Sequence, residues 1–186
     1  MSAVTSANYC DKGYYCIGES KTKTPIGNGG SRCTKGNYCE PGSAFQLPCP
    51  PGLACPNDGM SLADAKTFLC AEGYYCLVGA TTTSPKIVSL EGGNICPAGH
   101  YCPSPDPEYT DYNRGTSVPH PCPPGTYNPN TGTKSASGCT DCPVGFYCEH
   151  YGSTAPVLCE EGWYCDAKEV SSMPPNKFCP KGYYCT

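Results

Sequence analysis

Large apolar side chains are scarce in this sequence. Leu, Ile, Val and Phe together provide only 22 of the 186 residues, and there is a single Trp. A chain with less than roughly 20% of the four core-forming types is ordinarily disordered unless something other than apolar burial holds it. The composition therefore excludes a conventional hydrophobic core.

Charge and long apolar runs are also lacking. Lys and Arg number 12 against 16 Asp and Glu, the net charge is -4, and no basic cluster occurs, which argues against nucleic acid and anionic membrane surfaces as partners. No run approaches the roughly 18 apolar residues of a membrane span. The opening residues "MSAVTSANYC" lack the apolar stretch of a secretory signal. We therefore expect either a removed signal or a segment of a longer precursor.

Cysteine, in contrast, is abundant. The chain has 18, an even number, which is typical of a disulfide scaffold in an oxidising compartment. Zinc is the competing interpretation, but the chain has one C-x2-C pair, Cys139 and Cys142, and three isolated histidines. We predict an extracellular protein, secreted or at the cell surface, with no metal and no cofactor. All cysteines are expected in disulfides: Cys10, Cys16, Cys33, Cys39, Cys49, Cys55, Cys70, Cys76, Cys96, Cys102, Cys122, Cys139, Cys142, Cys148, Cys159, Cys165, Cys179, Cys185.

One seven-residue motif, C-x2-G-x-Y-C, recurs nine times, from "CDKGYYC" at Cys10 to "CPKGYYC" at Cys179. Every copy keeps the Gly, so we expect a turn with positive φ or close backbone approach there. Eight copies keep the Tyr, and Ala54 is the exception. We expect the Tyr to pack on a neighbouring disulfide or repeat; a carbohydrate-stacking face is the alternative.

The segments between motifs are rich in Pro, Gly, Ser and Thr and are predicted to be loops. A helix is expected only over residues 61–69, "SLADAKTFL", capped by Ser61 with Asp64 three residues on, and "KIV" (86–88) is a candidate strand fragment. The fold class is thus small and disulfide-rich: tandem repeats of short β-hairpins and loops, elongated, with almost no helix. The organisation is a lead (1–9), five repeats (10–121), a variant repeat (122–141) and three further repeats (142–186).

The sixth copy is irregular, because Asn128 replaces its second Cys and an extra Cys139 follows. The stretch "CPPGTYNPNTGTKSASGCTDCPVGFY" (122–147) resembles the ephrin-receptor-like cysteine-rich repeat and the first small module of tumour-necrosis-factor-receptor ectodomains. The other copies resemble a variant found in surface proteins of protists and algae, including fibrous flagellar hairs. The resemblance implies an extracellular module without catalytic residues and a disulfide between Cys122 and Cys139.

The other disulfides allow two schemes. Pairing within motifs, such as Cys10 with Cys16, closes every unit. Pairing across motifs, such as Cys16 with Cys33, staples each unit to the next and leaves Cys10 and Cys185 at the two ends. We favour the second scheme because it would stiffen a rod; a head-to-tail bond between chains would then use the two end cysteines.

The leading functional hypothesis is an extracellular structural protein whose tandem units form or line a fibre, filament or surface coat, with head-to-tail self-association. The alternative is a receptor-type ectodomain that binds a protein or glycan through aromatics such as Trp163, Tyr109 and Tyr112, with Asp106, Glu108 and Asp111 as calcium candidates. An enzyme is not expected, because no nucleophile-base set or phosphate loop is present.

Glycans are the other expected partners. The chain has no Asn-x-Ser/Thr site, so O-linked sugars on Pro-rich Ser/Thr loops are the candidates for a glycoprotein. The candidate residues are Thr22, Thr24, Thr81, Thr82, Thr83, Ser84, Ser153, Thr154, Ser171 and Ser172.

Overall fold

The computed structural model describes residues 9–109 and 113–185. The chain forms two compact units. One combines Met1–Ile95 with Ser104–Val118, and the other combines Cys96–Pro103 with Pro119–Thr186. Segment 104–118 therefore belongs to the first unit although both of its flanks lie in the second.

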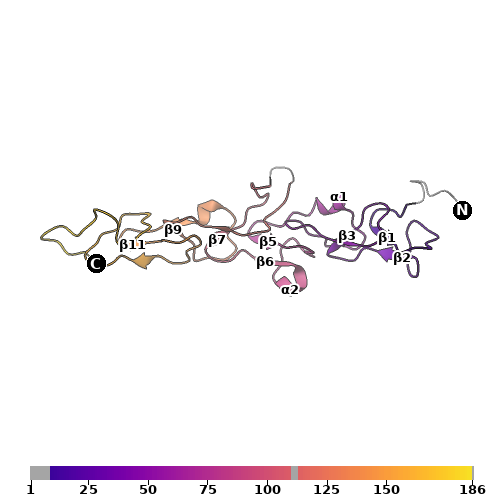
Figure 1. The fold of residues 1–186 in the computed structure, drawn as a ribbon, viewed down its shortest axis with the longest axis horizontal. Helices are drawn as coiled ribbons and strands as arrows, with labels where there is room; N and C mark the ends of the chain where they lie inside the picture. The colour runs from indigo at the N-terminus through magenta and orange to yellow at the C-terminus, as the bar shows by residue number, and fades with distance from the viewer. Residues whose placement is uncertain (1–8, 110–112, 186) are drawn as a thin grey trace. The chain divides into compact units, whose positions relative to one another are not determined.

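Both units consist of very short antiparallel hairpins joined by loops (Figure 1). The strands are β1 (Tyr14–Cys16), β2 (Gly30–Arg32), β3 (Asn37–Tyr38), β4 (Leu47–Pro48), β5 (Tyr74–Cys76), β6 (Gly93–Ile95), β7 (His100–Tyr101), β8 (His120–Pro121), β9 (Thr126–Tyr127), β10 (Thr140–Asp141), β11 (Phe146–Tyr147) and β12 (Val157–Leu158). The helices are α1 (Leu62–Ala65), α2 (Val88–Glu91) and a 3-10 turn, η2 (Ala136–Gly138). This confirms the predicted small, disulfide-rich class of tandem hairpins with little helix.

Every hairpin has the same register. The residue after the motif Gly faces the residue before the first Cys of the next motif, as in Tyr14 opposite Arg32 and Thr126 opposite Asp141. Six junctions are two-stranded sheets with the orders β1-β2, β3-β4, β5-β6, β7-β8, β9-β10 and β11-β12. The remaining two are the single bridges Leu53–Leu69 and Trp163–Phe178. Each hairpin thus joins one repeat to the next at a fixed position.

The disulfides close the motifs themselves. Eight of them join the two cysteines of one motif, six positions apart, as in Cys10–Cys16 and Cys179–Cys185. The ninth joins Cys122 to Cys139, the pairing that the family resemblance implies. The cross-motif scheme that we favoured is wrong: the glycine turn brings the Cα atoms of Cys70 and Cys76 to 5.7 Å, while the hairpins connect the repeats. No free cysteine exists among the described residues, so the interchain bond through Cys10 and Cys185 is wrong as well.

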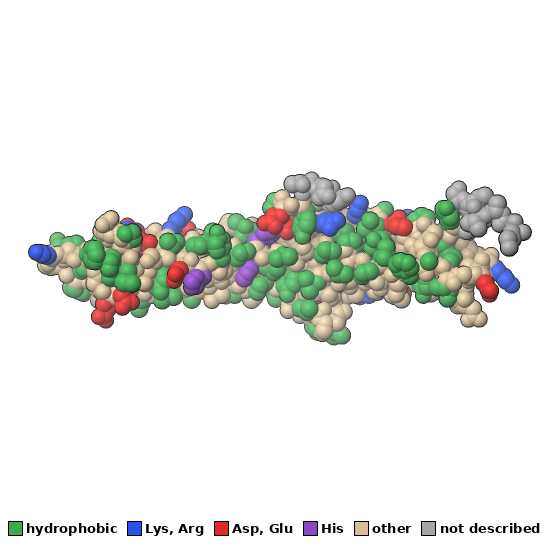
Figure 2. All heavy atoms as spheres, viewed as in Figure 1, with side chains coloured by type: hydrophobic (Ala, Val, Ile, Leu, Met, Phe, Trp, Pro, Cys, Tyr) green, Lys and Arg blue, Asp and Glu red, His purple; other side chains and the backbone are tan. Residues whose placement is uncertain are grey.

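Cystines make up most of the buried interior. One cluster surrounds Cys49–Cys55 with Leu53, Met60 and Ala65, and a second contains Ala54, Cys70, Cys76 and Ala80. Ala54, at the position where the other motifs have Tyr, is fully buried in the second cluster. Many larger apolar side chains are exposed instead, and Figure 2 shows hydrophobic atoms spread over the visible face. Disulfides and backbone hydrogen bonds therefore replace an apolar core.

The helices fit the local sequence only in part. Helix α1 begins after Ser61, as predicted, and has the predicted capping box with Asp64, but it covers only Leu62–Ala65 of the expected 61–69. The strand fragment expected at 86–88 is wrong. Ile87 is the N-cap of α2, the Glu91 carboxylate accepts hydrogen bonds from the Lys86 and Ile87 N–H groups, and Gly92 ends the helix in the left-handed conformation.

The cap of α1 gives a pH dependence. The Ser61 hydroxyl donates to the Asp64 carboxylate at 2.6 Å, the Ser61 N–H donates at 2.9 Å, and the Lys12 ammonium lies at 3.7 Å. The Ser61 hydrogen bonds, with the lysine adding to them, hold the pKa of Asp64 below its ordinary value of 3.8. The resulting stabilisation is fully present above that unfolded-state pKa and is lost as pH falls through the folded-state pKa.

We expect Ser61→Ala to lower the free energy of unfolding by about 1 kcal/mol at pH 7, because the cap is lost. The difference from the wild type should shrink at a pH well below 3.8, where Asp64 is protonated. Urea titrations at both pH values measure this difference in the free energy of unfolding. Ser137→Ala, whose hydroxyl shares a hydrogen bond with the Ser135 hydroxyl, is the control and should show no such pH dependence. An equal Ser61→Ala effect at both pH values would contradict the assignment.

Candidate interaction surface at the repeat junctions

The motif glycine is the centre of each junction. All nine have φ between +78° and +87°, which confirms the predicted positive φ. At six junctions the glycine N–H donates to the carbonyl of the second motif Cys, or of Asn128 in its place, in the next repeat, at 2.7–3.0 Å, as in Gly13 to Cys39. At seven junctions the glycine carbonyl accepts from the N–H of the next first Cys, at 2.8–3.1 Å. One glycine thus uses both backbone groups to hold the following repeat.

A second recurring residue completes the junction, and our sequence analysis missed it. It lies three or four positions after the second motif Cys, or after Asn128, and has positive φ. Its N–H donates to the carbonyl of the preceding motif's first Cys, as in Gly42 to Cys10 at 2.9 Å. The next carbonyl accepts from the preceding second Cys, as in Cys16 N–H to Ser43. We call these six residues the loop residues: Gly42, Gly59, Gly79, Gly132, Gly152 and Lys168.

The loop residues also reach the second neighbouring repeat. A Cβ built on Gly13 would lie 2.1 Å from the Gly59 carbonyl oxygen, and one on Gly99 would lie 2.1 Å from that of Gly152. The same relation joins Gly125 to Lys168, at 2.7 Å. Contacts therefore extend from each of these repeats to the next two.

Asn128 preserves the junction where the cysteine is missing. Its side chain is fully buried. The amide donates to the carbonyl of His100 at 3.0 Å and to the Thr133 hydroxyl at 2.8 Å, while its oxygen accepts from Asn130 N–H. Cys122 pairs with Cys139 instead, so Cys139 takes over the disulfide that Asn128 cannot form, as we predicted.

Segment 104–118 supplies a junction to the first unit. Gly115 N–H donates to the Gly52 carbonyl at 3.0 Å, and the Thr116 carbonyl accepts from Cys76 N–H at 3.0 Å. Thr116 thus occupies the acceptor role that residues after the loop positions have elsewhere. A longer loop after Cys102 therefore takes the place of the regular loop.

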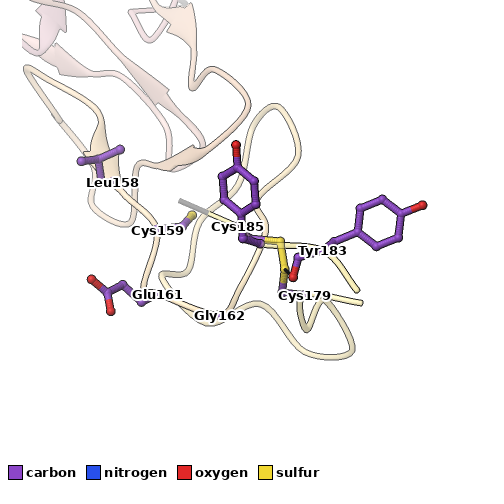
Figure 3. Close-up of a pocket in the computed structure, with 8 residues that line it drawn as sticks. Leu158, Cys159, Glu161, Gly162, Cys179, Tyr183 and Cys185 are labelled. Carbon is purple, nitrogen blue, oxygen red and sulfur yellow. Dashed lines mark hydrogen bonds between the residues drawn. A yellow bond between two sulfur atoms is a disulfide. The ribbon is translucent and has the colours of Figure 1, made fainter. Parts of the chain in front are cut away.

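In the last repeats, the surface beside the motif turn is exposed. A cleft of about 590 Å³ lies beside the Cys179–Cys185 disulfide (Figure 3). Its lining includes Leu158, Glu161, Gly162, Tyr183 and Tyr184. Tyr183 and Tyr184 are 76% and 89% exposed. The motif Tyr is half-buried up to Tyr147 and exposed in the last two repeats, so its predicted packing role holds where at least two further described repeats follow.

The described residues of the receptor alternative each have their own contacts in the structure. Trp163 packs on Phe178 with ring centroids 4.1 Å apart, as part of a junction. The Tyr109 hydroxyl forms a hydrogen bond with Ser117. The buried carboxylate of Asp106 accepts from Glu108 N–H, whereas Asp111 and Tyr112 lie outside the described residues. Over residues 9–109 and 113–185, no three His, Cys, Asp or Glu side chains gather as metal ligands would.

The glycosylation candidates differ in exposure. Thr22, Thr24 and Thr154 are exposed. Thr81, Thr82, Thr83, Ser84, Ser153, Ser171 and Ser172 are half-buried. The Ser153 hydroxyl donates to the His150 carbonyl, and the Ser171 hydroxyl accepts from Met173 N–H. The exposed threonines are therefore the accessible acceptors, and glycosylation itself stays a prediction.

Comparison with known proteins gives no family assignment. No family model matches the chain. A segment of 76 residues is 29% identical to ABC transporter G family member 25 of Oryza sativa subsp. japonica; it covers 39% of this chain and 8% of the transporter. The chain thus spans less than a tenth of that relative. Neither comparison identifies the chain as an ephrin-receptor-like repeat protein. In the described part of the chain, no helix is both long and apolar enough to cross a membrane. The disulfide content indicates an extracellular protein.

Gly99 and Gly162 allow the stability cost of backbone strain to be measured apart from the cost of a steric clash. Gly99 and Gly162 have nearly equal φ, +78° and +85°, but a Cβ on Gly162 would meet nothing within 4 Å. Substitution by Ala costs both about 1–2 kcal/mol of left-handed strain. We expect Gly99→Ala to lose about 2 kcal/mol more, because its Cβ collides with the Gly152 carbonyl. Chemical denaturation followed by circular dichroism, with disulfides intact, measures both. Equal losses would refute the close approach.

Proposed function

We propose that this chain is an extracellular structural protein whose disulfide-closed repeats stack in line and form or line a fibre, filament or surface coat. The observation that carries the proposal is the repeated junction. The same hydrogen bonds, from the motif glycine and the loop residue, recur from repeat to repeat despite different side chains. A further repeat can therefore be added without new geometry, which is the property that repeat arrays and filaments require.

The chemistry of the junction supports a structural role. The contacts between repeats use mostly backbone groups, so the outward side chains are free to vary. Reactive thiols are all consumed in disulfides among the described residues. Catalysis is therefore not part of the proposal, and the protein's contribution is length, stiffness and a chemically resistant surface.

A binding module is the second candidate. The cleft of about 590 Å³ and the exposed Tyr183 and Tyr184 beside it favour this candidate. Aromatic side chains anchor many interfaces and stack on sugar rings. A receptor-type ectodomain would use this cleft for a protein or glycan and would remain monodisperse.

Solution scattering tests the linear array. A compact 186-residue domain has a radius of gyration of roughly 16 Å. We expect the dilute protein to give a value well above this, with the length distribution of a stiff rod. A value near the compact one would contradict the proposal.

Electron imaging of concentrated protein separates the two candidates. The structural proposal predicts extended filaments, whereas the binding module predicts single particles of uniform size at every concentration.

A further inference from the structure

We propose that Asn28 is a self-modification site, at which the side-chain amide is lost by reaction with the Gly29 backbone nitrogen and with water. Asn28 lies at the tip of the hairpin that joins the first repeat to the second. The inference goes beyond the proposed function and applies equally if the chain is a binding module.

The reaction needs only water as its co-reactant. The Gly29 nitrogen attacks the side-chain carbonyl carbon of Asn28, loses its proton and closes a cyclic succinimide, while the side-chain nitrogen leaves as ammonia. Water then opens the ring at either of its carbonyls. The product is an aspartate, or an isoaspartate in which the backbone continues through the former side chain. The net change converts an amide and a water into a carboxylate and an ammonium ion.

The tip of this hairpin leaves both reacting groups open. Gly27 and Gly30 exchange two backbone hydrogen bonds of 3.1 Å, so Asn28 and Gly29 form a two-residue turn. The Asn28 side chain is exposed. Within residues 9–109 and 113–185, neither its amide nor the Gly29 N–H has a hydrogen bond to another residue. Glycine has no Cβ to obstruct the approach of its nitrogen, so the attack breaks no contact.

The chain has one comparable dipeptide, Asp58–Gly59, and there both groups are held. The Gly59 N–H donates to the Cys33 carbonyl at 2.7 Å. The Asp58 carboxylate accepts from the Lys35 N–H at 2.8 Å. Because Gly59 is a loop residue, its nitrogen is part of a junction. The fold, rather than the following glycine alone, therefore selects Asn28.

The exposure of this tip does not depend on what adjoins it along the chain. The β5–β6 hairpin of the fourth repeat is built in the same way, and a Cβ on Gly93 there would lie 2.2 Å from the Tyr75 carbonyl oxygen. A Cβ on Gly30 would lie 2.0 Å from the Tyr15 carbonyl oxygen. Residues 86–90, at the tip of that hairpin, are exposed although three repeats precede them. Protrusion is thus a property of the hairpin itself.

The modification changes the hairpin in two ways. A new carboxylate adds one negative charge to a chain whose net charge is -4. The isoaspartate also adds a backbone carbon between Gly27 and Gly30, whose hydrogen bonds fit a two-residue turn. Gly30 is the first residue of β2 and faces Cys16 in β1. The reaction therefore alters the tip of a junction hairpin, and modified chains can be separated by charge.

Incubation of the oxidised, folded protein at mildly alkaline pH tests the site, because the attacking nitrogen must lose its proton. Peptide mapping by mass spectrometry locates each converted amide, and enzymatic methylation of isoaspartate measures that product. Asn28 should convert ahead of every other asparagine, with release of ammonia and formation of isoaspartate. Asn28→Gln is the control, and its acidic form should be absent, because the longer side chain would have to close a larger ring.

Asp58→Asn tests whether the fold makes the selection. This change places a second Asn-Gly dipeptide where the Gly59 N–H is bonded, and the amide oxygen can still accept from the Lys35 N–H. In the folded variant, the amide at position 58 should convert about tenfold or more slowly than Asn28, because hydrogen bonds must open first. After reduction and unfolding, the two positions should convert at similar rates. Circular dichroism and disulfide mapping verify that each variant is folded at the start.

Three results would overturn the inference. One is an Asn28 that converts no faster than the other asparagines of the folded wild type, a comparison that needs no variant. Another is equal conversion at positions 28 and 58 in the folded variant, which would mean that the dipeptide alone decides. The third is a difference between these positions that persists after unfolding, since the neighbouring sequence would then be its cause. None of these results bears on the linear array, which the scattering test decides separately.

Discussion

The glycine at the centre of each disulfide-closed turn is the constraint on which the rest of the structure depends. Its positive φ lets a seven-residue motif close on its own cystine, and its lack of a side chain lets the carbonyl of a later loop approach. Gly52 shows both properties: φ is +80°, and a Cβ there would lie 2.4 Å from the Gly115 carbonyl oxygen. With so few apolar residues, the hydrogen bonds that this geometry permits, together with the cystines, supply the order that burial supplies in ordinary domains.

The architecture tolerates local exceptions because the contacts are made by the backbone. Asn128 substitutes for a half-cystine, Lys168 for a loop glycine, and Thr116 from a long loop for the residue that follows a loop glycine, and in each case the hydrogen-bond acceptor or donor is kept. Side chains that point outward can then differ between repeats without breaking the contacts that join them. The proposed structural role and a variable exterior would both rely on these backbone contacts.

The sequence predicted the repeat count, the positive φ of the motif glycines, the half-cystine exchange at Asn128 and the cap of α1, because each depends on residues close together in the chain. Disulfide connectivity was not predictable, since both schemes satisfy the same cysteines; the Cα separation created by the turn decides it. The loop residues were missed because their spacing from the cysteine varies between three and four positions and because Lys168 is not a glycine. The fold of residues 86–88 depends on the Glu91 carboxylate, which a three-residue pattern cannot reveal.

Amide hydrogen exchange measured by NMR on dilute, oxidised protein tests the central claim most directly. If the motif glycines hold the array together, the N–H groups of Gly13, Gly36, Gly52, Gly99 and Gly125, each within 2.9 Å of its acceptor, exchange slowly, while that of Gly182 exchanges at the rate of an open backbone. Fast exchange at the internal glycines, or equal protection at Gly182, would contradict the account.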